Sequence, residues 1–215
     1  MTSLLGVALA GGHSRRLGVD KRTLLIERQG RTLTLVDWTL VRLAAVCDEV
    51  VVATGEVEAR SEPGDPQHGA GARRVPDAPS PAAGPAAGLL GAALSHPGCA
   101  LLALACDLPR VPVALVERLA SEHRDHPEAA WIVPVRGGRL EPLCAVYAPE
   151  ALRTLARRAV EGRNALHELA SIESLQRREL EIDQLDELVG VVEPLLNLNT
   201  AEDLERFRGF ENRRV

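Results

Sequence analysis

Along the chain, short uninterrupted apolar runs alternate with longer segments in which apolar residues recur at helical spacing. The apolar runs are Leu4–Ala10, Glu49–Thr54 and Cys99–Ala105. The segments of helical spacing are Leu33–Val46, Gly84–Leu94 and Val113–His123. Continuous apolar runs are typical of strands buried on both faces, and alternation of strand with helix favours a parallel sheet with helices on both sides. We therefore expect an α/β fold.

The pattern changes in the second half, where Ala130–Tyr147 contains two extended runs separated by Gly137 and Gly138. Paired glycines suit the tight turn of a β-hairpin, so we expect an antiparallel hairpin added to a mostly parallel sheet. No internal repeat or shift in composition divides the chain. Residues 1–215 are therefore predicted to form one domain.

The remaining segments are mostly helical in pattern. Helices are predicted at Pro149–Val160, Asn164–Ala170 and Asn199–Phe207. The last of these is expected to take Asn199 or Thr200 as its N-cap, with acidic residues in the first turn. The charged segment Leu175–Leu180 is interpreted as surface, although part of it could face an anionic ligand.

Composition excludes several classes of protein. The net charge of −5 gives no overall attraction to nucleic acid or to an anionic membrane, and no apolar stretch approaches the ~20 residues that a membrane span needs. The four cysteines form no Cys-x-x-Cys pair, which favours free thiols in a reducing compartment. We expect a cytoplasmic protein with no nucleic-acid or membrane partner.

The segment VALAGGHSRRLGVDK (Val7–Lys21) joins the end of the first apolar run to a glycine-rich, basic stretch. Between His13 and Arg22, four cationic side chains and one aspartate give a local net charge of +3. Glycines at the carboxyl end of a buried strand let backbone N–H groups approach a phosphate. The segment fits neither the P-loop pattern nor the dinucleotide pattern G-x-G-x-x-G. From the residues alone, a phosphate-binding loop and a solvated turn both remain open.

Longer motifs favour the phosphate-binding alternative. LAGGHSRRLGVDK (Leu9–Lys21) resembles the signature loop of the nucleotidyltransferases that make molybdenum cofactor dinucleotides, with Leu17 where that family usually has Met. Four further stretches resemble family segments in the same order. They are VPDAPSPAAGPAAGLLGAAL (Val75–Leu94), LALACDLPRV (Leu102–Val111), EPLCAVY (Glu141–Tyr147) and LLNLNTAEDL (Leu195–Leu204). The resemblance therefore covers almost the whole chain.

This resemblance implies a fold and a reaction. The family fold is a three-layer α/β/α, Rossmann-like sheet, in agreement with the hydrophobic pattern. The family transfers a nucleoside monophosphate from a nucleoside triphosphate to the terminal phosphate of molybdopterin, releasing pyrophosphate. Such a transfer needs in-line positioning and charge neutralisation rather than a covalent nucleophile on the enzyme. Mg²⁺ is the cofactor that the resemblance implies.

The resemblance also assigns roles to residues. Asp107, at the end of a buried strand, matches the metal ligand and catalytic aspartate; a turn aspartate is the structural alternative. Arg16 and Lys21 match the catalytic groups that contact the triphosphate, with solvated surface charge as the alternative. The nucleotide-binding residues implied by the motifs are Leu9, Ala10, Gly11, Gly12, Lys21, Asp77, Gly84 and Asp107. Asn197 and Asn199 either bind the acceptor or cap the last helix.

Within the resemblance, an Ala-Gly-Gly loop accompanies guanine donors, and this chain has Ala10, Gly11 and Gly12 at that position. GTP is therefore the expected donor and molybdopterin the expected acceptor. The alternatives are a cytidylyltransferase, another nucleotidyltransferase acting on a phosphorylated acceptor, and an inactive nucleotide-binding module. The resemblance further implies partners among other molybdenum-cofactor assembly proteins.

Overall fold

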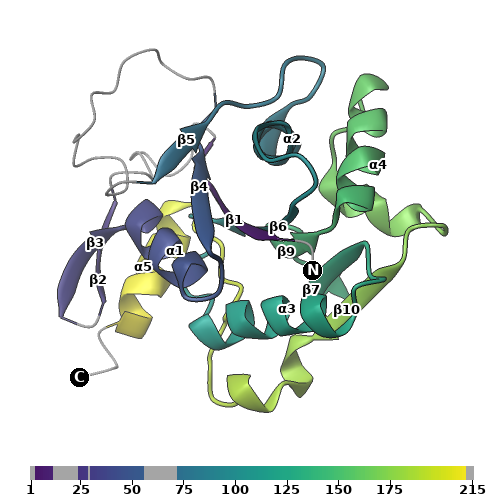
Figure 1. Ribbon diagram of the computed structural model, residues 1–215. Helices are drawn as coiled ribbons and strands as arrows, with labels where there is room; N and C mark the ends of the chain where they lie inside the picture. The colour runs from purple at the N-terminus through teal and green to yellow at the C-terminus, as the bar shows by residue number, and fades with distance from the viewer. Residues whose placement is uncertain (1–2, 12–23, 29, 56–71, 212–215) are drawn as a thin grey trace.

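The computed structural model describes residues 3–11, 24–28, 30–55 and 72–211. Within these ranges, eight strands form one mixed sheet and two more form a separate hairpin (Figure 1). The sheet consists of β1 (Leu4–Leu9), β4 (Glu49–Ala53), β5 (Arg73–Val75), β6 (Ala100–Ala105), β7 (Trp131–Arg136), β8 (Arg139–Leu140), β9 (Cys144–Tyr147) and β10 (Arg177–Glu181). The separate hairpin consists of β2 (Leu25–Arg28) and β3 (Arg31–Thr34).

Helices cover both faces of the sheet. The α-helices are α1 (Leu35–Ala44), α2 (Gly84–Ser95), α3 (Val113–Asp125), α4 (Pro149–Val160) and α5 (Ala201–Glu211). Three short 3₁₀ helices are described as well: η2 (Leu166–Ser171), η3 (Ile182–Gln184) and η4 (Asp186–Leu188). Helices α1 and α3 pack together on one face, and α2 and α4 pack together on the other (Figure 1). The three-layer α/β/α prediction is confirmed.

The strand order is β10-β7-β9-β6-β1-β4-β5, with β8 paired to β7. Strand β1 pairs in parallel with β4 and β6, and β4 pairs in parallel with β5. Strand β9 runs antiparallel to its neighbours β6 and β7, as the predicted hairpin requires. All six residues of β6 are buried, which explains why its sequence is a continuous apolar run. The carboxyl ends of β1, β4, β5 and β6 consequently meet at one edge of the sheet.

The helix predicted from Leu33 begins later, at Leu35. Thr34 forms a capping box: its hydroxyl accepts a hydrogen bond from the Asp37 backbone N–H at 3.0 Å, and the Asp37 carboxylate accepts one from the Thr34 backbone N–H. Capping of this kind satisfies the first free N–H groups of a helix. Leu33 therefore belongs to β3, and the β2–β3 hairpin is an element that the apolar pattern missed.

Three other predicted features, a glycine turn, a helical segment and a helix cap, are present in the structure. The turn between β7 and β8 contains Gly137 and Gly138, whose φ values are +55° and +74°. The helical segment predicted at Asn164–Ala170 is the 3₁₀ helix η2. Thr200 is the N-cap of α5, because its hydroxyl accepts a hydrogen bond from the Asp203 backbone N–H at 3.2 Å.

The charged side chains of Leu175–Leu180 lie at the surface, as the sequence analysis expected, but the segment is also part of a strand that the sequence analysis did not predict. Most of it belongs to β10, which pairs in parallel with β7 at the edge of the sheet. Its charged side chains face outward, while Leu180 is buried. A strand at a sheet edge with one solvated face carries charge of this kind, and the charge discourages pairing with other chains.

The edge strand is fastened to helix α3 through Glu122, whose side chain is only 6% exposed. Its carboxylate accepts hydrogen bonds from the guanidinium groups of Arg118, at 2.8 Å, and Arg178 of β10. Burial raises the pKa of Glu122, but the bonds from Arg178 and Arg118 outweigh it and hold the pKa below its ordinary value of 4.5. A depressed pKa stabilises the fold above the unfolded-state pKa, and this contribution is lost as the pH falls.

Glu122→Gln should therefore lower the free energy of unfolding at pH 7 by about 1–2 kcal/mol, less than for a fully buried pair because both arginines are partly exposed. The difference from wild type should shrink when the measurement is repeated near pH 4. Urea unfolding at the two pH values tests this. The control is Glu117→Gln, which removes an exposed carboxylate from the same helix. An equal difference for Glu122→Gln at both pH values would contradict the argument.

The four cysteines are free, as predicted. Burial raises the pKa of both Cys47 and Cys144 to about 12, so neither is a thiolate at neutral pH. Among the described residues, no helix is long and apolar enough to cross a bilayer.

Candidate active site

The sheet edge described above brings the sequence-predicted residues Leu9 and Ala10 next to the strand that precedes Asp107. The Ala10 backbone N–H donates to the Ala53 carbonyl at 2.9 Å, and the Cys106 N–H donates to the Leu9 carbonyl at 3.1 Å. Both bonds continue the parallel ladders beyond the ends of the strands. In open α/β sheets, ligands bind outside the carboxyl ends of the strands. This edge is therefore the candidate site.

Gly11 lies beside the end of β4. A Cβ atom built on Gly11 would be 3.6 Å from the Gly55 backbone nitrogen, and one built on Gly55 would be 4.0 Å from Asp77 Oδ2. The ends of β1, β4 and β5 are thus close neighbours. Asp77 follows β5 and is half-buried. The structure therefore places Leu9, Ala10, Gly11 and Asp77 at one end of the sheet, although they lie up to 68 positions apart in the sequence.

Asp77 also lies against helix α2. A Cβ built on Gly88 would be 3.5 Å from Asp77 Oδ1, and the Ala78 backbone N–H donates to the Ala87 carbonyl at 2.8 Å. Gly84 is the first residue of α2 and has φ +58°, a conformation that favours glycine. The helix-start interpretation of Gly84 is therefore correct. A close approach of ligand at Gly84 stays a prediction.

Asp107 lies two residues beyond the end of β6 and is half-buried. Its backbone carbonyl accepts a hydrogen bond from the Leu198 N–H at 2.8 Å. The segment that carries Asn197 and Asn199 is thereby held against Asp107, about 90 positions away in the sequence. The structure brings together two motifs that the sequence analysis could only order along the chain.

The two asparagines differ in their surroundings. Asn197 Oδ1 is buried and has no hydrogen-bond partner among the described residues. The Asn199 backbone N–H donates to Asp203 Oδ2 at 3.1 Å, beside the cap formed by Thr200. Because Thr200 supplies the cap, neither asparagine is the N-cap of α5. Acceptor binding by Asn197 and Asn199 stays a prediction.

Glu141 is a residue of this edge to which the sequence analysis gave no role. Burial raises its pKa, and the negative charge of Asp107 raises it further, while the Leu143 N–H that donates to Glu141 Oε1 at 3.0 Å opposes the shift. The Leu143 carbonyl in turn accepts from the Ala105 N–H at 2.8 Å, which fastens this strand to the end of β6. The position of Glu141 as the first residue of the matched segment Glu141–Tyr147 was the available signal.

The donor set at Asp107 fits a magnesium ion. Mg²⁺ takes hard oxygen ligands, and its sites commonly combine one or two carboxylates with water and substrate phosphates. Asp107 offers a carboxylate, and the neighbouring segment offers the buried amide oxygen of Asn197. Among the described residues, no group of three or more His, Cys, Asp or Glu side chains could hold a metal by itself.

Three predicted site residues, Gly12, Arg16 and Lys21, lie outside the described residues. Their roles therefore rest on the sequence motif.

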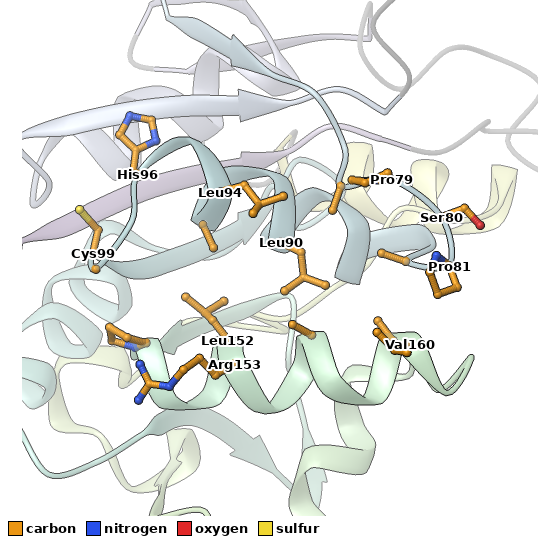
Figure 2. Close-up of a pocket in the computed structure, with 17 residues that line it drawn as sticks. Pro79, Ser80, Pro81, Leu90, Leu94, His96, Cys99, Leu152, Arg153 and Val160 are labelled. Atoms are coloured by element: carbon orange, nitrogen blue, oxygen red, sulfur yellow. The ribbon is translucent and has the colours of Figure 1, made fainter.

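A separate cavity of about 450 Å³ lies between helices α2 and α4 (Figure 2). Figure 2 shows Leu90 and Leu94 of α2 facing Leu152 and Val160 of α4 across it. None of the sequence-predicted site residues lines this cavity. Its lining is mostly apolar, with few of the polar groups that bind a triphosphate. The cavity is therefore distinct from the candidate active site.

Comparison with known proteins identifies the family of the chain. Residues 6–178 match the family model described as the MobA-like NTP transferase domain. The chain is similar to the probable molybdenum cofactor guanylyltransferase of Chloroflexus aggregans, at 31% identity over 95% of this chain and 93% of the relative. It is also similar to the molybdenum cofactor biosynthesis bifunctional protein of Synechocystis sp., at 30% identity over 94% of this chain. The chain spans about half, 53%, of the length of that bifunctional relative.

Among solved structures, the fold is similar to that of molybdopterin-guanine dinucleotide biosynthesis protein A from Archaeoglobus fulgidus. The TM-score is 0.74 with 24% identity, over 98% of this chain and 99% of the other. At this identity the likeness concerns the fold.

Proposed function

Because the chain belongs to the MobA-like NTP transferase domain family, we propose that it transfers GMP from GTP to the terminal phosphate of molybdopterin. The product is the molybdopterin guanine dinucleotide, and pyrophosphate is released. The observation that carries the proposal is the meeting of Leu9–Gly11, Asp77 and Asp107 at the carboxyl edge of one sheet. Relatives named molybdenum cofactor guanylyltransferase support the choice of reaction.

The chemistry requires one bond to form and one to break. An oxygen of the acceptor phosphate attacks the α-phosphorus of GTP, and the bond from the α-phosphorus to the oxygen that bridges it to the β-phosphorus breaks. Because the acceptor is already an anion, no side chain needs to act as a covalent nucleophile. The protein has to hold the two substrates in line and offset the charge on the transferring group.

The predicted site residues divide this work. The backbone of Leu9–Gly12 holds the nucleoside and phosphates, Asp77 and Gly84 line the nucleotide, and Asn197 with Asn199 faces the acceptor. Asp107 would hold Mg²⁺, with the Asn197 amide as a further oxygen donor. A bound Mg²⁺ supplies positive charge to the α-phosphate. Arg16 and Lys21 bind the triphosphate and offset the charge of the departing pyrophosphate.

GTP is expected to bind at least ~10-fold more tightly than CTP in the presence of Mg²⁺, a difference of about 1.4 kcal/mol. The reason is the Ala10–Gly12 loop, whose backbone groups can pair with the carbonyl and N–H groups of guanine. Calorimetric titration of each nucleotide, with Mg²⁺ and with a chelator, measures this directly. A GTP preference justifies the transfer assay with molybdopterin.

The other outcomes correspond to the alternative functions. Preference for CTP would assign the chain to cytidylyl transfer. Binding of neither nucleotide, with or without acceptor, would favour an inactive module. Tight GTP binding that does not depend on Mg²⁺ and is not followed by transfer would also favour an inactive nucleotide-binding module.

Two further features belong to the proposal. Other molybdenum-cofactor assembly proteins are the expected donors of molybdopterin and recipients of the product, as the family membership suggests. The use of GTP supports a reaction in the cytoplasm.

A further inference from the structure

The residues that follow Asp107 form a turn whose carbonyl oxygens are bound by side chains of helix α1. Trp38 Nε1 donates to the Pro109 carbonyl at 3.0 Å. Arg42 Nη1 donates to the carbonyls of Leu108 and Val111, at 2.9 Å each. Three of the four carbonyls from Leu108 to Val111 are therefore held by two side chains that lie one helical turn apart.

Arg42 is entirely buried, at 0% exposed. Its other nitrogens are also bound: Nε donates to the Trp38 carbonyl at 3.3 Å, and Nη2 donates to Thr39 Oγ1 at 3.0 Å. The guanidinium lies 5.3 Å from the centroid of the Trp38 ring. Burying a guanidinium is costly even when it is fully bonded, and a well-packed apolar side chain often stabilises a core as well or better. Stability alone is therefore a weak explanation for an arginine at this position. The planar fork of donors of an arginine is well suited to holding several carbonyl groups in fixed positions.

The same turn is also bonded to the C-terminal segment of the chain. The Leu198 N–H binds the Asp107 carbonyl, as described above. The Arg110 side chain donates to the Val192 carbonyl through Nε, at 3.0 Å, and Nη2, at 2.6 Å. Its guanidinium also lies 4.1 Å from the centroid of the Phe210 ring in α5. The backbone around Asp107 is thus fixed between α1 and the C-terminal segment.

We propose that Trp38 and Arg42 are positioning residues for Asp107: by binding the Leu108–Val111 carbonyls, they hold the Asp107 carboxylate where it serves Mg²⁺-dependent GTP binding. This inference rests on the proposed function. Magnesium requires near-ideal octahedral geometry, so its affinity depends on where a protein carboxylate lies. A displacement of about 1 Å at a reacting centre can cost ~10²-fold in rate. Neither side chain is itself expected to touch substrate.

The test compares GTP affinity at a fixed Mg²⁺ concentration below saturation and with a chelator in Trp38→Phe and Arg42→Lys. Trp38→Phe keeps an aromatic ring and removes the donor to Pro109. Arg42→Lys keeps the charge and removes the planar fork of donors. Each variant should lose about 10-fold of the Mg²⁺-dependent gain in affinity, the equivalent of one hydrogen bond to a strained or charged site. GTP binding in chelator should be unchanged. Raising the Mg²⁺ concentration should restore much of the loss.

The matched control is Arg158→Lys, which alters another buried arginine, paired with Glu168 on the α2–α4 side of the sheet. We expect it to lower thermal stability while leaving the Mg²⁺-dependent gain as in wild type. The proposal is overturned if Trp38→Phe and Arg42→Lys behave like this control. Should Arg42→Lys fail to fold, Trp38→Phe decides the question alone.

Asp107→Asn separates this proposal from the proposed function. If Asp107→Asn abolishes the Mg²⁺-dependent gain while Trp38→Phe and Arg42→Lys retain it, the positioning role fails and the function stands. If Asp107→Asn leaves the gain intact, the assignment of the metal site fails and the positioning role fails with it.

Discussion

Asp107→Asn is expected to reduce GMP transfer by on the order of 10²–10³-fold while the protein stays folded. The substitution keeps the size and shape of the side chain and removes its negative charge. Asp107 lies at the end of β6, where every strand residue is buried and the backbone is held by the Leu198 N–H. The loss should therefore fall on the cation and the transferring phosphate rather than on packing.

Transfer is measured by the release of pyrophosphate from GTP in the presence of molybdopterin, and folding by thermal unfolding. The matched control is Asp48→Asn, an exposed aspartate that precedes β4 at the opposite edge of the sheet. Asp48→Asn should retain the wild-type rate. Near-normal transfer by Asp107→Asn would remove the central residue from the proposed mechanism.

The parts of the fold that determine this site could be predicted from the sequence. Strands β1 and β6 are buried along all or nearly all of their length and β4 over its last three residues, so their sequences are mostly apolar and stand out against the helices. Once they are parallel neighbours, residues that follow them must share one edge. The proximity of Leu9, Ala10 and Asp107 follows from that argument.

Elements at the periphery could not be predicted in the same way. Strand β10 has alternating exposed charges, and its sequence looks like a solvated helix or loop until β7 provides a pairing partner. The β2–β3 hairpin has only four residues in each strand and lies outside the main sheet. The capping box of Thr34 and Asp37 was a local signal that separates β3 from α1. The prediction followed the apolar spacing instead, because Leu33 and Leu35 both fit a helical pattern, and it therefore placed the start of the helix too early.

The sequence could not show which distant side chains support the site. Trp38 and Arg42 are separated from the carbonyls they bind by 66 to 71 positions. In the sequence, they resemble ordinary residues of an amphipathic helix, and a buried arginine cannot be distinguished there from a solvated one. Glu141 is similar, since only tertiary packing shows that its carboxyl group shares an environment with Asp107.

Gly91→Ala is expected to have the largest effect on stability, because helix α2 touches the backbone before Asp77 at this position. A Cβ on Gly91 would lie 2.0 Å from the Pro76 carbonyl oxygen and 3.1 Å from the Ala78 nitrogen. Both are backbone atoms, so the overlap can be relieved only by moving the helix or the Asp77 segment. We expect the free energy of unfolding to fall by about 3 kcal/mol or more.

Gly209→Ala is the control, since Gly209 is also a helical glycine, but its built Cβ would meet no atom within 4 Å among the described residues outside the nearby backbone of its own helix. Alanine should stabilise α5 there by up to about 1 kcal/mol through its higher helix propensity. Urea unfolding therefore should give opposite signs for the same chemical change at two helices. Gly91→Ala should also weaken GTP binding, because the segment that must yield carries Asp77, whereas Gly209→Ala should not. Equal stability of the two variants would contradict the argument that close contact between α2 and the Asp77 segment requires glycine at position 91.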